Sequence, residues 1–158
     1  GQRYVIARVV NAGAESKTSN DVRAASDRDW FGPVAPDGDE GHDSLETALD
    51  LGSFKGTQQW PGRTIDSAGD VDWYKFTTQR TGTSGRKVQI NFTHAEGDLA
   101  LALYQSDGTL APILLPEADK TGNSELIKLT GLLPGTYYLK VLSNHADVSR
   151  AYKLTIQV

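Results

Sequence analysis

The sequence predicts an all-β fold of the sandwich or jelly-roll class. Three observations predict it: several runs in which apolar and polar residues alternate, turn residues between those runs, and only one good helix signal. Alternation with a period of two is typical of half-buried strands, because successive side chains of a strand point to opposite faces. The chain has 158 residues, of which 38% are hydrophobic, and this is enough to bury one core.

Composition and charge exclude several classes of protein. The chain has 16 Lys and Arg against 20 Asp and Glu, and a net charge of −4 argues against a nucleic-acid binder, which needs a basic face. No run approaches the ~18 apolar residues of a membrane-spanning helix. The absence of cysteine excludes a disulfide framework, a thiolate zinc site and a cysteine nucleophile. Gly1 in place of an initiator methionine indicates a processed product or an excised fragment.

The first part of the chain is patterned differently from the rest. Residues 4–10 predict a strand, which is followed by a polar, weakly patterned stretch and by a boundary signal at Trp30–Pro33. We therefore expect an N-terminal segment at residues 1–35 and a β-sandwich at residues 36–158. The segment is either the tail of a preceding β-domain or linker, or an additional strand of this sandwich.

One short helix is expected near the start of the sandwich. Asp43 is a candidate N-cap, and Glu46 stands at the third helical position of a capping box. Residues 45–49 contain an apolar stripe, and Gly52 is expected to end the helix after about two turns.

Six alternating or apolar runs predict strands. They lie at residues 71–77, 88–92, 99–104, 126–129, 137–141 and 152–158. The run at 99–104 is apolar on both faces, so we expect it to be covered on both sides. Turn residues at Ser106–Gly108 and Pro134–Gly135 separate the runs.

The aromatic residues divide into expected core positions and candidate surface positions. Four of them alternate in step with apolar neighbours and are expected in the core: Phe76, Phe92, Tyr137 and Tyr152. Trp60 is expected in a loop, and Trp73 is expected to face outward. Tyr104 and Tyr138 alternate away from the core, so with Trp60 they are the candidate ligand-binding aromatics.

Acidic residues are concentrated between positions 36 and 72. Only Lys55 and Arg63 oppose nine acids in this stretch, which gives 2 − 9 = −7: Asp37, Asp39, Glu40, Asp43, Glu46, Asp50, Asp66, Asp70 and Asp72. Such a cluster repels itself unless it is solvated or holds a cation. Both interpretations, a solvated acidic face and a cation site, are open from composition alone.

Five segments, in order, resemble the bacterial pre-peptidase C-terminal domain family. The family's acidic opening resembles Glu40–Ser44, its Asp-x-Asp-aromatic strand resembles Gly69–Phe76, and its Gly-Asp-Leu hairpin strand resembles Gly97–Tyr104. The last two strands of the family resemble Leu133–Val141 and Tyr152–Ile156.

The resemblance implies a jelly-roll β-sandwich that is not itself catalytic. Members are usually appended to secreted bacterial proteases or other extracellular enzymes, so the expected partner is a covalently linked upstream domain and the expected location is secreted or cell-surface. The similar collagen-binding domains of clostridial collagenases bind calcium near the acidic opening and grip an extended polymer through exposed tyrosines. The second implied partner is therefore an extracellular protein or polysaccharide polymer.

The resemblance also implies a set of calcium ligands. The matching positions in this sequence are Glu40, Asp43, Asp70 and Asp72, and His42 stands where the family uses Asn. Calcium takes six to eight oxygen ligands. Two further acids, Asp37 and Asp39, are expected to complete the shell.

No catalytic constellation is evident in the sequence. It contains no HExxH motif, no G-x-S-x-G turn and no phosphate-binding glycine loop. The three histidines, His42, His94 and His145, are far apart and are expected to be exposed or hydrogen-bonded loop residues. We therefore expect an accessory module and not an enzyme, with polymer binding as the alternative function.

Overall fold

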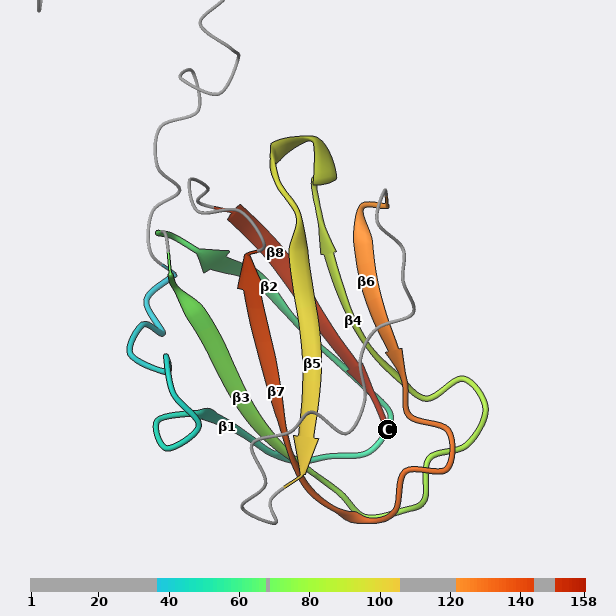
Figure 1. Cartoon of the computed structure of the whole chain (residues 1–158). Helices are drawn as coiled ribbons and strands as arrows, with labels where there is room; N and C mark the ends of the chain where they lie inside the picture. The colour runs from blue at the N-terminus through green and yellow to red at the C-terminus, as the bar shows by residue number, and fades with distance from the viewer. Residues whose placement is uncertain (1–36, 68, 106–121, 144–149) are drawn as a thin grey trace, which may run out of the picture. The chain divides into compact units, whose positions relative to one another are not determined.

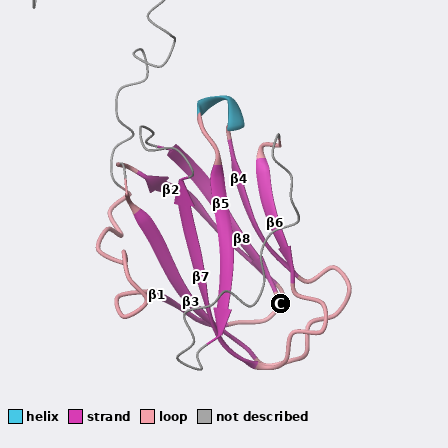
Figure 2. Ribbon diagram, in the orientation of Figure 1, coloured by secondary structure: helices cyan, strands magenta, loops and turns pink. Residues whose placement is uncertain are grey.

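In the residues that the computed structural model describes, eight strands form a sandwich of two four-stranded sheets (Figure 1). The structure describes residues 37–67, 69–105, 122–143 and 150–158. The strands are β1 (Leu49–Ser53), β2 (Thr57–Ile65), β3 (Val71–Thr78), β4 (Lys87–Phe92), β5 (Leu99–Gln105), β6 (Ser124–Lys128), β7 (Gly135–Ser143) and β8 (Arg150–Gln157). The 3₁₀ turn η2 (His94–Glu96) lies between β4 and β5 (Figure 2).

Consecutive strands alternate between the two sheets. One sheet has the order β1-β3-β7-β5 and the other has the order β2-β8-β4-β6. All neighbouring pairs are antiparallel except β1 and β3, which run parallel. This arrangement confirms the predicted all-β sandwich, and each of the six runs expected to form strands does so.

The core lies between the two sheets and is built from alternate residues of each strand. The four aromatic residues expected in the core, Phe76, Phe92, Tyr137 and Tyr152, are all buried. In β5, Leu99, Leu101 and Leu103 are buried, and Ala102 on the opposite face is buried as well. The expectation that this strand is covered on both sides is thus confirmed at Ala102.

The expected short helix at residues 43–51 is wrong. Residues 44–47 form a single turn in which the Ser44 and Thr47 side chains bond to each other's backbone amides, and residues from Leu49 onward form β1. Pairing with β3 satisfies backbone groups of both strands and packs Leu49 and Leu51 against the core. The tertiary pairing thus outweighs the weak local helix signal.

The expected loop around Trp60 is also wrong. Trp60 lies in β2, where it pairs with Leu154 of β8, and Pro61–Gly62 forms an irregularity that interrupts the ladder. A proline is compatible with this strand because β2 is at the edge of its sheet.

Several expectations fall on residues outside the described ranges. These are the N-terminal segment with its boundary at residue 35, the turn at Ser106–Gly108, and His145. Within the described ranges, no helix is both long and apolar enough to cross a membrane.

Candidate metal centre

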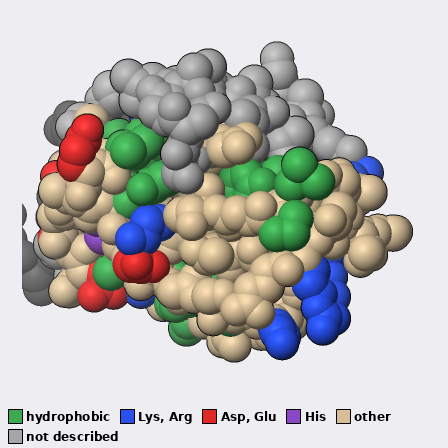
Figure 3. Space-filling view, turned by 90° about the horizontal axis from the view of Figure 1, so that it is seen from below, with side chains coloured by type: hydrophobic (Ala, Val, Ile, Leu, Met, Phe, Trp, Pro, Cys, Tyr) green, Lys and Arg blue, Asp and Glu red, His purple; other side chains and the backbone are tan. Residues whose placement is uncertain are grey.

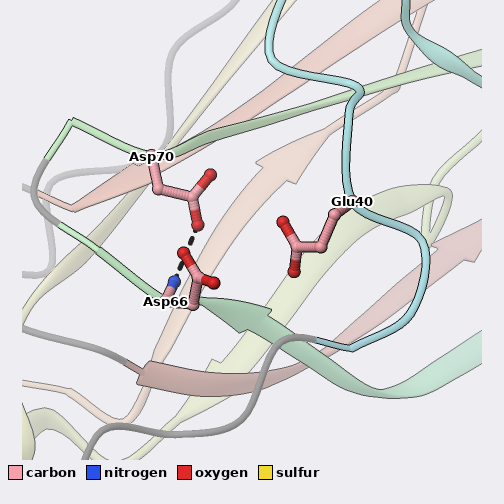
Figure 4. Close-up of side chains that lie close together, drawn as sticks. All are labelled: Glu40, Asp66 and Asp70. Atoms are coloured by element: carbon pink, nitrogen blue, oxygen red, sulfur yellow. Dashed lines mark hydrogen bonds between the residues drawn. The ribbon is translucent and has the colours of Figure 1, made fainter.

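Three carboxylates converge at one end of the sandwich. Glu40 lies in the segment before β1, Asp66 directly follows β2, and Asp70 directly precedes β3. One oxygen of each carboxylate lies within 4.8 Å of an oxygen of the other two. Figure 4 shows the three side chains pointing toward one another. We call Glu40, Asp66 and Asp70 the acidic cluster.

The turn between β2 and β3 brings two of these carboxylates together. The Asp70 amide donates a hydrogen bond to the Ser67 carbonyl oxygen at 3.3 Å, which closes the turn. Gly69 has φ +90°, a conformation that disfavours a side chain. The Asp66 amide donates to Asp70 Oδ2 at 2.7 Å, so the Asp70 carboxylate is oriented toward Asp66.

A backbone contact with β3 positions the segment that carries Glu40. The Trp73 amide donates a hydrogen bond to the His42 carbonyl oxygen at 2.9 Å. Earlier in the same segment, Asp39 pairs with Arg63 of β2, and Asp37 Oδ2 lies 3.8 Å from an Arg63 nitrogen. The Thr64 amide donates to the same Asp37 oxygen at 3.1 Å. Asp37 and Asp39 therefore attach the segment to β2 through protein partners.

In the part of the chain that the structure describes, no Lys or Arg forms an ion pair with the acidic cluster. Partial burial raises the pKa of Asp70, and the neighbouring Asp66 charge raises it further. Partial burial likewise raises the pKa of Glu40, and the charges of Asp66 and Asp70 add to this effect. The Asp66 charge thus opposes ionisation of Glu40 and Asp70, and a bound cation would remove this repulsion.

Asp72 lies behind the cluster, inside the sandwich. Its side chain is buried, and the Tyr152 hydroxyl donates a hydrogen bond to Asp72 Oδ2. The Tyr74 hydroxyl lies 3.5 Å from the same oxygen and 2.6 Å from the Tyr152 hydroxyl. Burial raises the pKa of Asp72 to about 8, against the opposing effect of the Tyr152 hydrogen bond.

His42 also lies in this buried region, although an exposed or hydrogen-bonded loop residue was expected. Only 4% of its surface is exposed, and its ring is 5.1 Å from the Tyr74 ring. His42 Nδ1 is 3.5 Å from Asp72 Oδ1, and neither ring nitrogen makes a hydrogen bond. The expectation for His42 is therefore wrong, because backbone pairing with Trp73 carries the residue into the sandwich.

The structure brings together only part of the expected ligand set. Glu40 and Asp70 are in the acidic cluster, while Asp43 is exposed and lies outside it. The third member, Asp66, is one of the nine clustered acids but is not among the ligands that the resemblance implies. Its position in the sequence, directly after the apolar Ile65 and four residues before Asp70, is the signal that could have identified it.

The candidate ligand-binding aromatics fall into two places. Tyr104 of β5 and Tyr138 of β7 are directly paired across the sheet, and both are half-buried. The Trp73 and Tyr104 rings are 4.9 Å apart, and Lys140 Nζ lies 5.6 Å from the centre of a Trp73 ring. Trp60 is on the other sheet, where its ring is 5.7 Å from Phe54.

The described residues form an all-β sandwich, and part of this sandwich matches a known domain family. Residues 70–143 match the family model of the bacterial pre-peptidase C-terminal domain, which is the family that the sequence resembles. This family consists of non-catalytic accessory domains.

One similar solved structure is the pre-peptidase C-terminal domain of the collagenase from Bacillus anthracis. It is 19% identical in sequence, the match covers 68% of this chain and 91% of that chain, and the TM-score is 0.48. Among curated protein sequences, none matches this chain significantly.

Proposed function

We propose that this chain is a non-catalytic accessory module of a secreted or cell-surface bacterial protein, and that the acidic cluster binds Ca²⁺. The observation that supports the calcium site is the convergence of Glu40, Asp66 and Asp70 from two separate segments, with the pKa values of Glu40 and Asp70 raised. The module would be joined covalently to an upstream domain, such as a protease or another extracellular enzyme.

The chemistry of the acidic cluster fits calcium. Ca²⁺ prefers hard oxygen ligands, takes six to eight of them at about 2.3–2.6 Å, and tolerates irregular geometry. Three carboxylates supply three to six oxygens, and the remaining positions suit water and backbone carbonyls. The other carboxylates expected as ligands have protein partners or lie apart: Asp37 and Asp39 face Arg63, Asp72 bonds to Tyr152, and Asp43 is exposed.

A cation at the acidic cluster would fix the start of the module. Glu40 belongs to the segment by which the chain enters β1, whereas Asp66 and Asp70 belong to the β2–β3 turn. Ligation by both segments would offset the conformational entropy lost when the entry segment is ordered. The proposed role of calcium is therefore to stiffen the junction between this module and whatever precedes it.

The test is a thermal melt of the chelator-treated protein, repeated with millimolar Ca²⁺ and with millimolar Mg²⁺. At a Ca²⁺ concentration about 100 times Kd, linkage gives roughly 2.7 kcal/mol of stabilisation, or about 5–11 °C in melting temperature. A rise selective for Ca²⁺ is expected. Equal melting temperatures in all three conditions would mean that the acids form a solvated face.

A second candidate function is polymer binding on the outer face of the β1-β3-β7-β5 sheet. The observation that favours it is the pair of half-buried rings Tyr104 and Tyr138 on neighbouring strands. Trp73 lies against Tyr104 with Lys140 beside it, but Trp73 is only 8% exposed, so the two tyrosines would make the contact. Aromatic rings of this kind suit extended protein or polysaccharide chains. Pull-down on collagen, chitin and cellulose, with Tyr138→Ala for comparison, tests this function. Failure to bind any of the three would favour a spacer.

A further inference from the structure

A small cavity lies at the end of the sandwich opposite the acidic cluster. Its volume is about 170 Å³, and its walls come from the β1–β2 connection, the segment after β3, the segment after β6 and the end of the chain. Three apolar side chains contribute to its lining: Phe54, Leu129 and Leu132. A cavity of this size accommodates one aliphatic side chain and a small polar group.

The charged side chains that line the cavity are cationic. Lys55, Arg80 and Arg86 all line it, and no acidic side chain of the described residues does. Within the described residues, neither Lys55 nor Arg80 forms an ion pair, while Arg86 donates a hydrogen bond to the Val158 carbonyl oxygen. Figure 3, which views the molecule from below, shows Lys and Arg side chains gathered at one edge of this face and hydrophobic side chains beside them.

Backbone hydrogen bonds hold the walls of this cavity in place. The Gly82 amide donates to the Leu132 carbonyl oxygen at 2.8 Å, and the Gly131 amide donates back to the Gly82 carbonyl oxygen at 2.8 Å. On the other side, Gly56 and Val158 exchange two hydrogen bonds of 2.8 and 2.9 Å. Because the walls are cross-linked by the backbone, a ligand would lose little free energy to ordering the site.

We propose that this cavity binds an acidic peptide segment, with one aliphatic side chain of the peptide inside it and adjacent carboxylates on Lys55 and Arg80. The apolar lining favours a ligand with an apolar part over a bare inorganic anion, because only the former removes Phe54 and Leu132 from water. The unpaired cations favour carboxylates on that ligand, since charge-assisted hydrogen bonds to Arg and Lys are the stronger ones. A long polyanion is disfavoured by the net charge of −4.

This proposal does not depend on the calcium site. The cavity lies where β3 ends and β2 begins, whereas the acidic cluster lies where β3 begins and β2 ends. Chelation of calcium and substitution of the cationic residues therefore test the two proposals separately.

The test measures binding of a fluorescent peptide of alternating glutamate and leucine to the full chain in the presence of Ca²⁺. Two comparison peptides carry glutamine for glutamate or alanine for leucine, and inorganic phosphate serves as a competitor. We expect the first peptide to bind more tightly than both comparison peptides, and its affinity to fall as salt rises. The double variant Lys55→Gln/Arg80→Gln should weaken binding about tenfold or more, which corresponds to about 1.4 kcal/mol.

Lys153→Gln is the matched control, because Lys153 lies on β8 outside the cavity lining. It should leave the affinity unchanged. Three results would overturn the proposal: equal binding of the glutamate and glutamine peptides, equal losses in Lys153→Gln and the double variant, or displacement of the peptide by phosphate at similar concentrations. The last result would indicate a simple anion site.

Discussion

Tyr152 of β8 donates a hydrogen bond to Asp72 of β3, and this bond joins the two sheets through the interior of the sandwich. Both side chains are buried, at 3% and 2% exposure, so the carboxyl group has no access to bulk water. The Tyr74 hydroxyl bonds to the Tyr152 hydroxyl at 2.6 Å and completes a small polar network beside the apolar core residues. Buried polar groups of this kind depend on one another, because a group that loses its partner keeps its desolvation cost.

Tyr152→Phe should therefore destabilise the protein. The substitution removes the donor to Asp72 while keeping the ring, and an unsatisfied buried polar group costs about 1–3 kcal/mol. Urea unfolding of the wild type and the variant measures this free energy. Tyr138→Phe is the control, since Tyr138 lies on the outer face of its sheet and should change stability by less than about 0.5 kcal/mol. Equal effects of the two substitutions would show that the network does not stabilise the core.

Gly82→Ala should also be destabilising, for a steric reason. A Cβ atom at position 82 would overlap the carbonyl oxygen of Leu129, which is backbone and cannot rotate away. Overpacking of this kind costs about 1–3 kcal/mol. Gly135→Ala is the control, because a Cβ there would meet only Tyr137 atoms at ordinary contact distances of 3.6–3.7 Å. A melting temperature of Gly82→Ala equal to that of Gly135→Ala would contradict the close approach of the two segments.

The sequence was informative where alternation was strong and misleading where local signals competed with pairing. The β8 run alternates cleanly and forms the expected strand. By contrast, Asp43 and Glu46 have the spacing of a helix start, yet the residues that follow form β1 because the edge of β3 is available for pairing. A local pattern cannot report which strand edge will be free, since that depends on residues more than 20 positions away.

The sequence predicts that carboxylates of residues 36–72 form the candidate site, but it does not identify which of them come together. Alternation had already placed Phe76 in the core, and Asp72 has the same parity, so its burial could have been inferred. Asp66 was harder to assign, because its approach to Glu40 depends on how the entry segment lies against β3. Proximity across segments of this kind is a property of the tertiary fold and leaves no periodic signal in the sequence.

The ion pair between β1 and β3 should be visible in the titration of Asp50. Lys75 Nζ lies 2.6 Å from Asp50 Oδ2, and this contact lowers the pKa of Asp50, with a smaller contribution from the Gly52 amide. A folded-state pKa below the unfolded one stabilises the protein above the unfolded pKa, and this stabilisation is lost as pH falls through the folded pKa. The loss should therefore fall in the acid range below about pH 4.

An NMR titration of the Asp50 carboxyl carbon measures this pKa directly. In Lys75→Gln the lysine charge is absent, and the pKa of Asp50 should rise toward its ordinary value. The same pKa in Lys75→Gln and the wild type would show that the pair does not persist in solution.

Asp70→Asn and Asp43→Asn together distinguish the acidic cluster from the ligand set implied by the family resemblance. In Asp70→Asn the cluster loses a charge but the side-chain oxygen can still accept the Asp66 amide, so the turn is preserved. We expect this variant to melt no lower than the wild type in chelator, because one source of repulsion is gone, but to lose most of the Ca²⁺-induced rise. Asp43→Asn should keep the full rise, since Asp43 lies outside the cluster.

Thermal melts of both variants at matched Ca²⁺ concentrations make the comparison. An equal loss of the rise in Asp43→Asn would mean that Asp43 is a ligand after all, and that the entry segment comes closer to the cation than the acidic cluster alone indicates.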